Sequence, residues 1–289
     1  MTVKQWGLTL AELTKVRITL FVAITTAAGY LLYRGGVDAG MVMPTAGLFI
    51  LACGSAALNQ YQERDTDAGM PRTRHRPIPS GDVSPRAALL IIVGLVTVGS
   101  LLLLWGGGMT AFLLGLLALF WYNGVYLFLK RRTAFAVVPG SLIGAISPMA
   151  GWVSAGGPIR DPAILAVATF FFIWQIPHFW LLLLKYGKEY EAVGYPSLTQ
   201  KFSMSQIARL TFTWTVATAT IGALIPLWAG MTSSLTRFLL LLAGAVLVIR
   251  ARKLLFLQTR PFSVQSAFMD INIYALMVLV ILCADRILI

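Results

Sequence analysis

Long apolar runs recur along almost the whole of this chain. Each is close to the roughly 20 residues that an α-helix needs to cross the hydrocarbon core of a bilayer. Since only helices and closed barrels can cross that core, runs of this length predict helices. We therefore expect an all-α integral membrane protein in which nine transmembrane helices form one bundle, a single domain over residues 1–289. The expected spans are residues 16–33, 41–62, 87–105, 109–129, 134–154, 162–184, 207–229, 233–249 and 266–284.

The composition agrees with a membrane protein and excludes an ordinary soluble domain. Hydrophobic residues make up 58% of the chain and charged residues only 12%, whereas soluble domains carry about 25% charged residues. A net charge of +12 could indicate a nucleic-acid partner, but the basic residues lie between apolar runs, as they do in membrane proteins. We therefore expect membrane lipid around the chain and no nucleic acid. Cys53 and Cys283 both lie inside apolar runs and predict no structural disulfide.

The distribution of lysine and arginine predicts the orientation. With nine spans, only Arg34, Arg160, Arg237 and Arg286 fall on one side, and 19 of the 23 basic residues fall on the other. Cytoplasmic connections carry the basic excess, so we expect a cytoplasmic N-terminus and an outside C-terminus. The connections after the second and sixth runs are the long ones, and both lie on the basic side. Long connections tend to be functional, which predicts an active site on the cytoplasmic side of the inner membrane.

A polar stripe at the end of the second run predicts a metal site. Asn59, Glu63 and Asp67 recur at every fourth residue, so they share one stripe of a helix. An acidic residue in or near the hydrocarbon layer is costly and indicates function. Carboxylate and amide oxygens suit Mg²⁺, which takes one or two ligands from protein and the rest from water and phosphate. The alternative is a helix end whose acids simply meet water.

Basic residues after this stripe predict a diphosphate site. Arg72 and Arg76 follow it in a proline-rich segment, and guanidinium groups bind diphosphate and stabilise it as a leaving group. Lys130, after the fourth run, and Lys185, after the sixth, are further candidates. The alternative for all four residues is that they only set the orientation of the chain in the membrane.

A third cluster lies at the end of the sixth run, where Trp174 to Trp180 include Pro177 and His178. An intramembrane histidine can be a base, a haem ligand or a hydrogen-bonding strut between helices. Glu189 follows on the same side of the membrane and could complete a metal site with the first acids.

Together these residues resemble the UbiA superfamily of intramembrane prenyltransferases. Its first signature resembles the stretch from Asn59 to Pro77. The continuation Arg-Thr-Arg-His-Arg-Pro-Ile-Pro-Ser-Gly and the His178 cluster resemble the protoheme IX farnesyltransferase branch. The quinone-precursor branch usually has a second pair of aspartates after the sixth span, where this chain has the His178 cluster instead. Glu63 and Glu189 stand where the family usually has aspartate.

The resemblance implies a bundle with a lateral opening to lipid, and farnesyl transfer from farnesyl diphosphate to haem B, giving haem O. It also implies a catalytic set made of Asn59, Glu63, Asp67, Arg72, Arg76, His178 and Glu189. A haem A synthase is a candidate partner. The Mg²⁺ ligands would be Asn59, Glu63, Asp67 and Glu189; the diphosphate ligands Arg72 and Arg76, with Lys130 and Lys185 as candidates; and the haem-binding residue His178.

Other functions would leave other signals in the sequence. A UbiA-type enzyme with an aromatic or quinone-precursor acceptor would share the first signature. A transporter of an anionic substrate should have repeated halves and interrupted helices at the midplane, and the sequence has no matching repeat. A non-catalytic haem-binding protein should have paired intramembrane histidines, and only His178 lies in an apolar run.

Overall fold

The computed structural model describes residues 2–256 and 263–288, and within them the chain is helical with no strand. The expected all-α class is confirmed. Arg260, which counts among the cytoplasmic charges, lies outside the described residues. The α-helices are α1 (Val3–Leu13), α2 (Val16–Arg34), α3 (Val42–Ala68), α4 (Pro85–Phe120), α5 (Leu127–Lys130), α6 (Val137–Gly140), α7 (Leu142–Ser154), α8 (Pro162–Ala192), α9 (Met204–Trp228), α10 (Ser234–Ala251) and α11 (Val264–Leu288). Short 3₁₀ turns occur at η1 (Ala39–Met41), η3 (Leu198–Gln200) and η4 (Arg252–Phe256), and a π-helical turn at η2 (Trp121–Tyr126).

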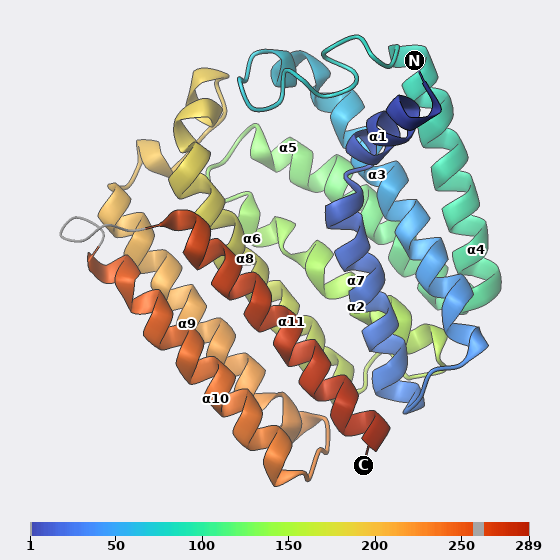
Figure 1. Ribbon diagram of the computed structural model, residues 1–289, viewed down its shortest axis with the longest axis vertical. Helices are drawn as coiled ribbons and strands as arrows, with labels where there is room; N and C mark the ends of the chain where they lie inside the picture. The colour runs from blue at the N-terminus through green and yellow to red at the C-terminus, as the bar shows by residue number, and fades with distance from the viewer. Residues whose placement is uncertain (1, 257–262, 289) are drawn as a thin grey trace.

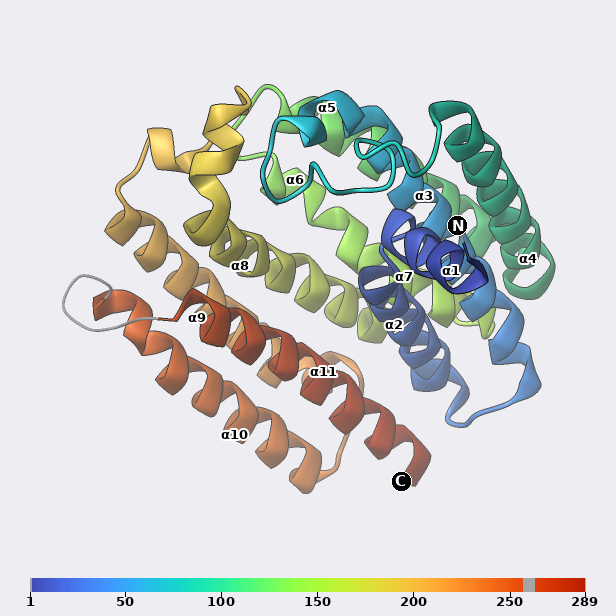
Figure 2. The ribbon, with the colours of Figure 1, turned by 45° about the horizontal axis from the view of Figure 1, so that its top comes forward.

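The long helices form one bundle in which neighbours along the chain are mostly neighbours in space (Figure 1). On one side, α3 packs against α2 and α4, and α7 packs against α2 and α4. On the other side, α9 lies between α8 and α10, and α11 contacts α10, α8 and α2. Figure 2 shows α9, α10 and α11 side by side in a second view. The N-terminus and the C-terminus lie at opposite ends of the bundle (Figure 1).

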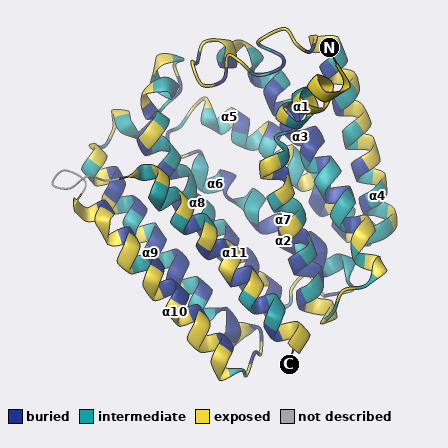
Figure 3. Ribbon diagram, in the orientation of Figure 1, coloured by how far each residue is buried: buried dark blue, intermediate teal, exposed yellow. Residues whose placement is uncertain are grey.

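Seven segments of the described chain are long and apolar enough to cross a membrane. Their outward faces expose large apolar side chains, among them Leu90, Trp105 and Leu227, and Figure 3 shows exposed residues along the outer faces of α4 and α9. Such faces are expected where lipid is the solvent. The segments are Val16–Arg34, Ala39–Ala68, Pro85–Lys130, Val137–Ser154, Pro162–Ala192, Met204–Trp228 and Val264–Leu288.

The longest of these segments folds back on itself at Gly108. This residue has φ +77° and ψ 179°, a backbone conformation that is essentially restricted to glycine. The side chain of Leu103 lies against the Cα positions of both Gly107 and Gly115, although a straight helix would separate Leu103 from Gly115 by about 18 Å. The expected runs 87–105 and 109–129 are therefore two arms of one bent segment.

Glycines bring α2 and α7 into backbone contact. A Cβ atom added to Gly29 would lie 2.0 Å from the carbonyl oxygen of Pro148, and one added to Gly151 would lie 1.8 Å from that of Thr26. Between membrane helices there is no hydrophobic driving force, so close packing of small residues holds them together. This contact fixes α2, and with it the residue that precedes α2.

Two helices extend farther than their apolar runs predict. α3 ends at Ala68 and α8 at Ala192, whereas the runs end at residues 62 and 184. The polar stripe is therefore helical along its whole length. The N-terminal helix α1 was not expected from the apolar pattern.

Replacing Gly108 with alanine should lower the free energy of unfolding by about 1–3 kcal/mol, because a side chain disfavours this backbone conformation. A Cβ atom has open space there, so the loss would come from the backbone and not from a clash. Gly94→Ala, in the same helix and also with open space, should leave stability unchanged or slightly higher. Thermal unfolding in detergent measures both variants, and equal melting temperatures would contradict the bend.

Candidate active site

The last turns of α3 carry the predicted stripe into the protein interior. Asn59, Glu63 and Asp67 are only 3%, 5% and 1% exposed. Asp65, which is off the stripe, has a side chain that is 88% exposed. The three stripe residues therefore do not face water as the acids of a solvated helix end would, and burying two carboxylates requires partners that offset the loss of hydration.

Glu63 receives donors from three parts of the chain. Its Oε1 atom lies 2.7 Å from Nζ of Lys130 and 2.9 Å from the hydroxyl of Tyr195, and its Oε2 atom accepts from the amide of Asn59 at 3.0 Å. The ammonium of Lys130 also lies over the rings of Tyr190 and Tyr195, 5.3 Å and 4.8 Å from their centroids. The pKa of Tyr195 is raised, mainly by burial and next by the negative charge of Glu63. Its hydroxyl therefore stays protonated and can donate to Glu63.

Asp67 pairs with Arg76, which the connection between α3 and α4 holds in place. The Arg76 Nη1 atom lies 2.6 Å from Oδ2 of Asp67. The hydroxyl of Thr73 donates to the Asp67 carbonyl at 2.9 Å. Ile78 and Val83 are buried in a small cluster with residues of α1, α3 and α4. The connection thus has its own core, which positions the guanidinium group.

Lys15, treated by sequence reasoning only as an orientation charge, also contacts the stripe. Its Nζ atom donates to Oδ1 of Asn59 at 2.8 Å. Lys15 joins α1 to α2 with φ 51°, the one positive φ among the described non-glycine residues, and such strain clusters at functional sites. The Gln60 amide donates to the last carbonyls of α1 and ties this corner to α3. The pKa of Lys15 is lowered to about 7, mainly by burial and next by the positive charge of Arg76 nearby.

The π-helical turn η2 brings tyrosines beside the stripe. The hydroxyl of Tyr122 lies 3.4 Å from Oδ1 of Asn59, and the rings of Tyr122 and Tyr126 stack with centroids 5.8 Å apart. The Asn123 amide donates to the hydroxyl of Ser55 at 2.6 Å, which fixes the turn against α3. π-Helical turns frequently occur at functional sites.

Arg72 and Lys185 lie farther out, and both are exposed. Their cationic groups lie over the same ring, that of Tyr186, each 5.1 Å from its centroid. Neither forms an ion pair with Glu63 or Asp67 within the described ranges. Tyr186, which sequence reasoning missed, thus joins the connection after α3 to the end of α8.

The predicted Mg²⁺ ligands do not form a closed cage. No group of three or more His, Cys, Asp or Glu residues in the described part of the chain could hold a metal ion. Glu189, near the end of α8, has a buried Oε2 atom without a hydrogen-bond partner among the described residues. Mg²⁺ that arrives with a diphosphate needs only one or two protein carboxylates. The oxygens of Asn59, Glu63 and Asp67 suit that kind of binding, whereas no hydrogen bond or ion pair among the described residues joins Glu189 to the stripe.

His178 lies apart from this network, between α8 and α11. Its ring centroid is 4.8 Å from that of Trp174 and 4.6 Å from that of Phe268, and the ring forms a hydrogen bond with the side chain of Asn272. The Nδ1 atom is buried and has no partner among the described residues. The structure therefore brings together the stripe, Arg76 and Lys130, and leaves His178 in an aromatic contact.

Replacing Lys130 with methionine should destabilise the protein by about 3–5 kcal/mol, because the buried carboxylate of Glu63 would lose its cation. Adding Glu63→Gln to the same chain should recover part of the loss, since the charge is then removed as well. Thermal unfolding of the single and double variants in detergent measures the coupling. Lys188→Met, at an exposed position of α8, is the control, and a Lys130→Met protein as stable as this control would argue against the pairing.

Comparison with known proteins identifies a family. The model described as the UbiA prenyltransferase family matches residues 22–275. The protoheme IX farnesyltransferase of Nitratidesulfovibrio vulgaris (strain Hildenborough) is 36% identical over 249 residues, which cover 84% of this chain and 87% of that protein. The enzyme of the same name from Oleidesulfovibrio alaskensis is 33% identical over 276 residues, covering 96% of this chain and 95% of that protein.

Solved structures share the fold. A digeranylgeranylglyceryl phosphate synthase structure superposes with a TM-score of 0.77 at 15% identity, covering 97% of this chain and 98% of that one. A UbiA homologue from Archaeoglobus fulgidus, bound to GPP and Mg²⁺, superposes with a TM-score of 0.68 at 12% identity, covering 97% and 100%. At these identities the similarity concerns the fold alone.

Proposed function

This chain belongs to the UbiA prenyltransferase family, and from that membership we propose that it transfers a farnesyl group from farnesyl diphosphate to a vinyl group of haem B, giving haem O. Relatives that match nearly its whole length carry the name protoheme IX farnesyltransferase. The structural observation that carries the proposal is the buried stripe of α3, whose carboxylates are paired with a lysine and an arginine.

Diphosphate can bind to Lys130 and Arg76 only if their ion pairs with Glu63 and Asp67 are broken. Lys130 and Arg76 exchange their carboxylate partners for diphosphate oxygens, and Arg72 and Lys185 add donors from the outer edge of the site. Charge-assisted hydrogen bonds of this kind strengthen as negative charge develops on the leaving group. Lys15 holds the amide of Asn59 in place.

The freed carboxylates of Glu63 and Asp67, with Asn59 and Glu189, would hold Mg²⁺. Glu189 supports this role because its Oε2 atom is buried without a partner among the described residues. When bound, Mg²⁺ supplies Lewis-acid stabilisation of the departing diphosphate. UbiA homologues from Archaeoglobus fulgidus have been solved bound to GPP or DMAPP together with Mg²⁺, which supports Mg²⁺ as the metal but names no ligand in this chain.

The reaction requires an interior that excludes water. Breaking the C–O bond of farnesyl diphosphate sends the electron pair to the diphosphate and leaves an allylic cation that water would quench. The vinyl group of haem B then forms the new C–C bond. The cation left beside the porphyrin ring takes the oxygen of a water molecule, whose proton the released diphosphate can accept. We assign His178 to positioning haem B, and its unpartnered Nδ1 atom supports that role.

The chain is a multi-pass membrane protein, and nine spans is the count that we propose. Because of the bend at Gly108, the segment Pro85–Lys130 crosses the membrane twice, which turns the seven segments into eight crossings. The ninth crossing is α10, an apolar helix of 18 residues. An odd number of spans and the excess of basic residues on one side support a cytoplasmic N-terminus. They also support an active site on the cytoplasmic side of the inner membrane. A haem A synthase, which would consume haem O, is the candidate partner.

Purified protein incubated with haem B, farnesyl diphosphate and Mg²⁺ should convert the porphyrin to its hydroxyethylfarnesyl derivative, detected by mass spectrometry. Asp67→Asn should lower turnover at least about 100-fold, because the site would then hold Mg²⁺ at the leaving group less well, and chelation of Mg²⁺ should do the same. Asp65→Asn, at an exposed position outside the stripe, should keep full activity. An unchanged haem together with prenylation of an aromatic acid would reassign the acceptor.

Alkaline phosphatase fused to the C-terminus should be active, because the enzyme needs disulfides that form only outside the cytoplasm. The same enzyme fused after Ser80, in the connection between α3 and α4, should be inactive. Activity at both sites or at neither would contradict the proposed orientation. Activity only after Ser80 would reverse it.

A further inference from the structure

A cleft lies at the end of the bundle opposite the candidate active site. α2 begins beside Lys15 and ends 19 residues later at the cleft, a length of about 28 Å along the helix. The cleft has a volume of about 320 Å³ and lies where the ends of α2, α7, α9 and α11 meet the start of α8. Tyr33, Trp152, Trp228 and Arg286 are among the residues that line it.

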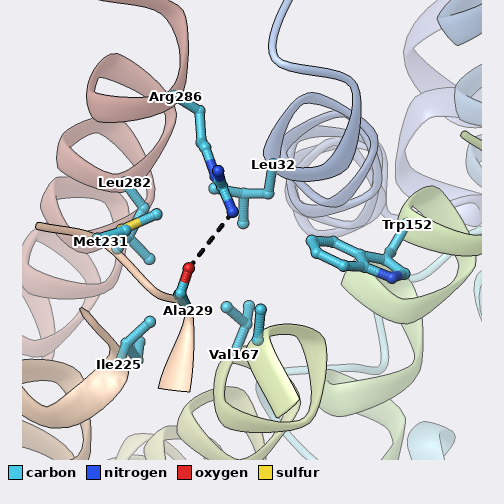
Figure 4. Close-up of a pocket in the computed structure, with 9 residues that line it drawn as sticks. Leu32, Trp152, Val167, Ile225, Ala229, Met231, Leu282 and Arg286 are labelled. Atoms are coloured by element: carbon cyan, nitrogen blue, oxygen red, sulfur yellow. Dashed lines mark hydrogen bonds between the residues drawn. The ribbon is translucent and has the colours of Figure 1, made fainter. Parts of the chain in front are cut away.

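The inner wall of the cleft is apolar. Val167, Ile225 and Leu282 line a small apolar pocket that adjoins the cleft and shares Arg286 with it, and Figure 4 shows Val167 and Ile225 below the guanidinium group. A ligand here would therefore meet polar groups at the mouth and hydrocarbon beneath them. Such a combination suits an amphiphile better than a fully solvated ion.

Two arginines converge on the connection between α9 and α10. Nη2 of Arg286, on α11, lies 3.4 Å from the carbonyl oxygen of Ala229 (Figure 4), which is a long contact for a hydrogen bond. Nη2 of Arg237, on α10, lies 2.9 Å from the carbonyl oxygen of Met231. Within residues 2–256 and 263–288, neither arginine has an ion pair with a carboxylate.

The acidic side chains nearby are engaged by other groups. Asp161, which also lines the mouth, accepts from the backbone N–H of Ala163 at 2.9 Å and caps α8. Asp285 accepts from the hydroxyl of Thr236. The guanidinium charge at the cleft therefore lacks a partner of opposite sign within the described residues.

The aromatic residues indicate the depth of the cleft in the membrane. Tyr33 is 42% and Trp228 49% exposed, and such side chains are enriched at the level of the lipid headgroups. Leu227, next to Trp228, is 66% exposed, as expected of an apolar side chain in contact with lipid. The mouth of the cleft is thus within reach of a headgroup while its acyl chains stay in the bilayer.

We propose that this cleft binds the phosphate headgroup of an anionic phospholipid from the adjoining leaflet, with Arg286 as its main ligand. The phosphate replaces the long contact of Arg286 to the Ala229 carbonyl with a charge-assisted hydrogen bond. Arg237 adds a second positive charge on the other side of the same connection. The site is separate from the farnesyl-transfer chemistry and does not depend on it.

Native mass spectrometry of the full chain in detergent, titrated with phosphatidylglycerol or phosphatidylcholine, tests the proposal. The wild type should retain phosphatidylglycerol in preference to phosphatidylcholine. Arg286→Gln should retain about fivefold less phosphatidylglycerol, since a charge-assisted contact is lost. Arg160→Gln, exposed on the same side of the bundle, is the control and should bind like the wild type.

Three results would overturn the proposal: equal retention by Arg286→Gln and the wild type, no preference for the anionic lipid, or displacement of the lipid by inorganic phosphate at equal concentration. The last would make the cleft a site for free anions. Melting temperatures check that Arg286→Gln is folded. If it is not folded, Arg286→Lys replaces it, because lysine keeps the charge but loses the bidentate fork of the guanidinium group. This variant should bind the lipid more weakly than the wild type. Equal binding would count against Arg286 as the lipid ligand.

Discussion

Pairing of buried carboxylates with cations is the constraint on which this structure depends. Glu63 and Asp67 lie inside a mostly apolar bundle, where an unpaired carboxylate would cost several kcal/mol. Lys130 and Arg76 offset that cost at 2.7 Å and 2.6 Å. These cations come from different parts of the chain, so the fold has to deliver both to one stripe of α3.

Much of the architecture positions the cationic side chains beside this stripe. The glycine contact between α2 and α7 fixes the start of α2, and hence Lys15. The small core around Ile78 and Val83 fixes the connection that carries Arg76. The turn η2 is anchored to α3 by Asn123 and leads directly into α5, which ends at Lys130.

The periodic features could be predicted from the sequence, and the long-range ones could not. Apolar runs predicted the helices, and four-residue spacing predicted the stripe from Asn59 to Asp67, because both signals are local. Lys15 looks like any basic residue ahead of a span, and only the tertiary structure brings it to Asn59. Tyr186 and Tyr195 gave no signal either, since their partners lie in a distant connection and in α3. The site roles that we propose from the resemblance await the experiments above.

The mutual pairing of acids and cations has a consequence for selectivity. A free metal ion that took Glu63 or Asp67 would strand a buried ammonium or guanidinium group, and a free anion that took Lys130 or Arg76 would strand a carboxylate. Each intruder alone would meet a penalty close to that of breaking a buried ion pair. Only a metal ion and a diphosphate that arrive together satisfy both halves at once, so the resting site disfavours either ion on its own.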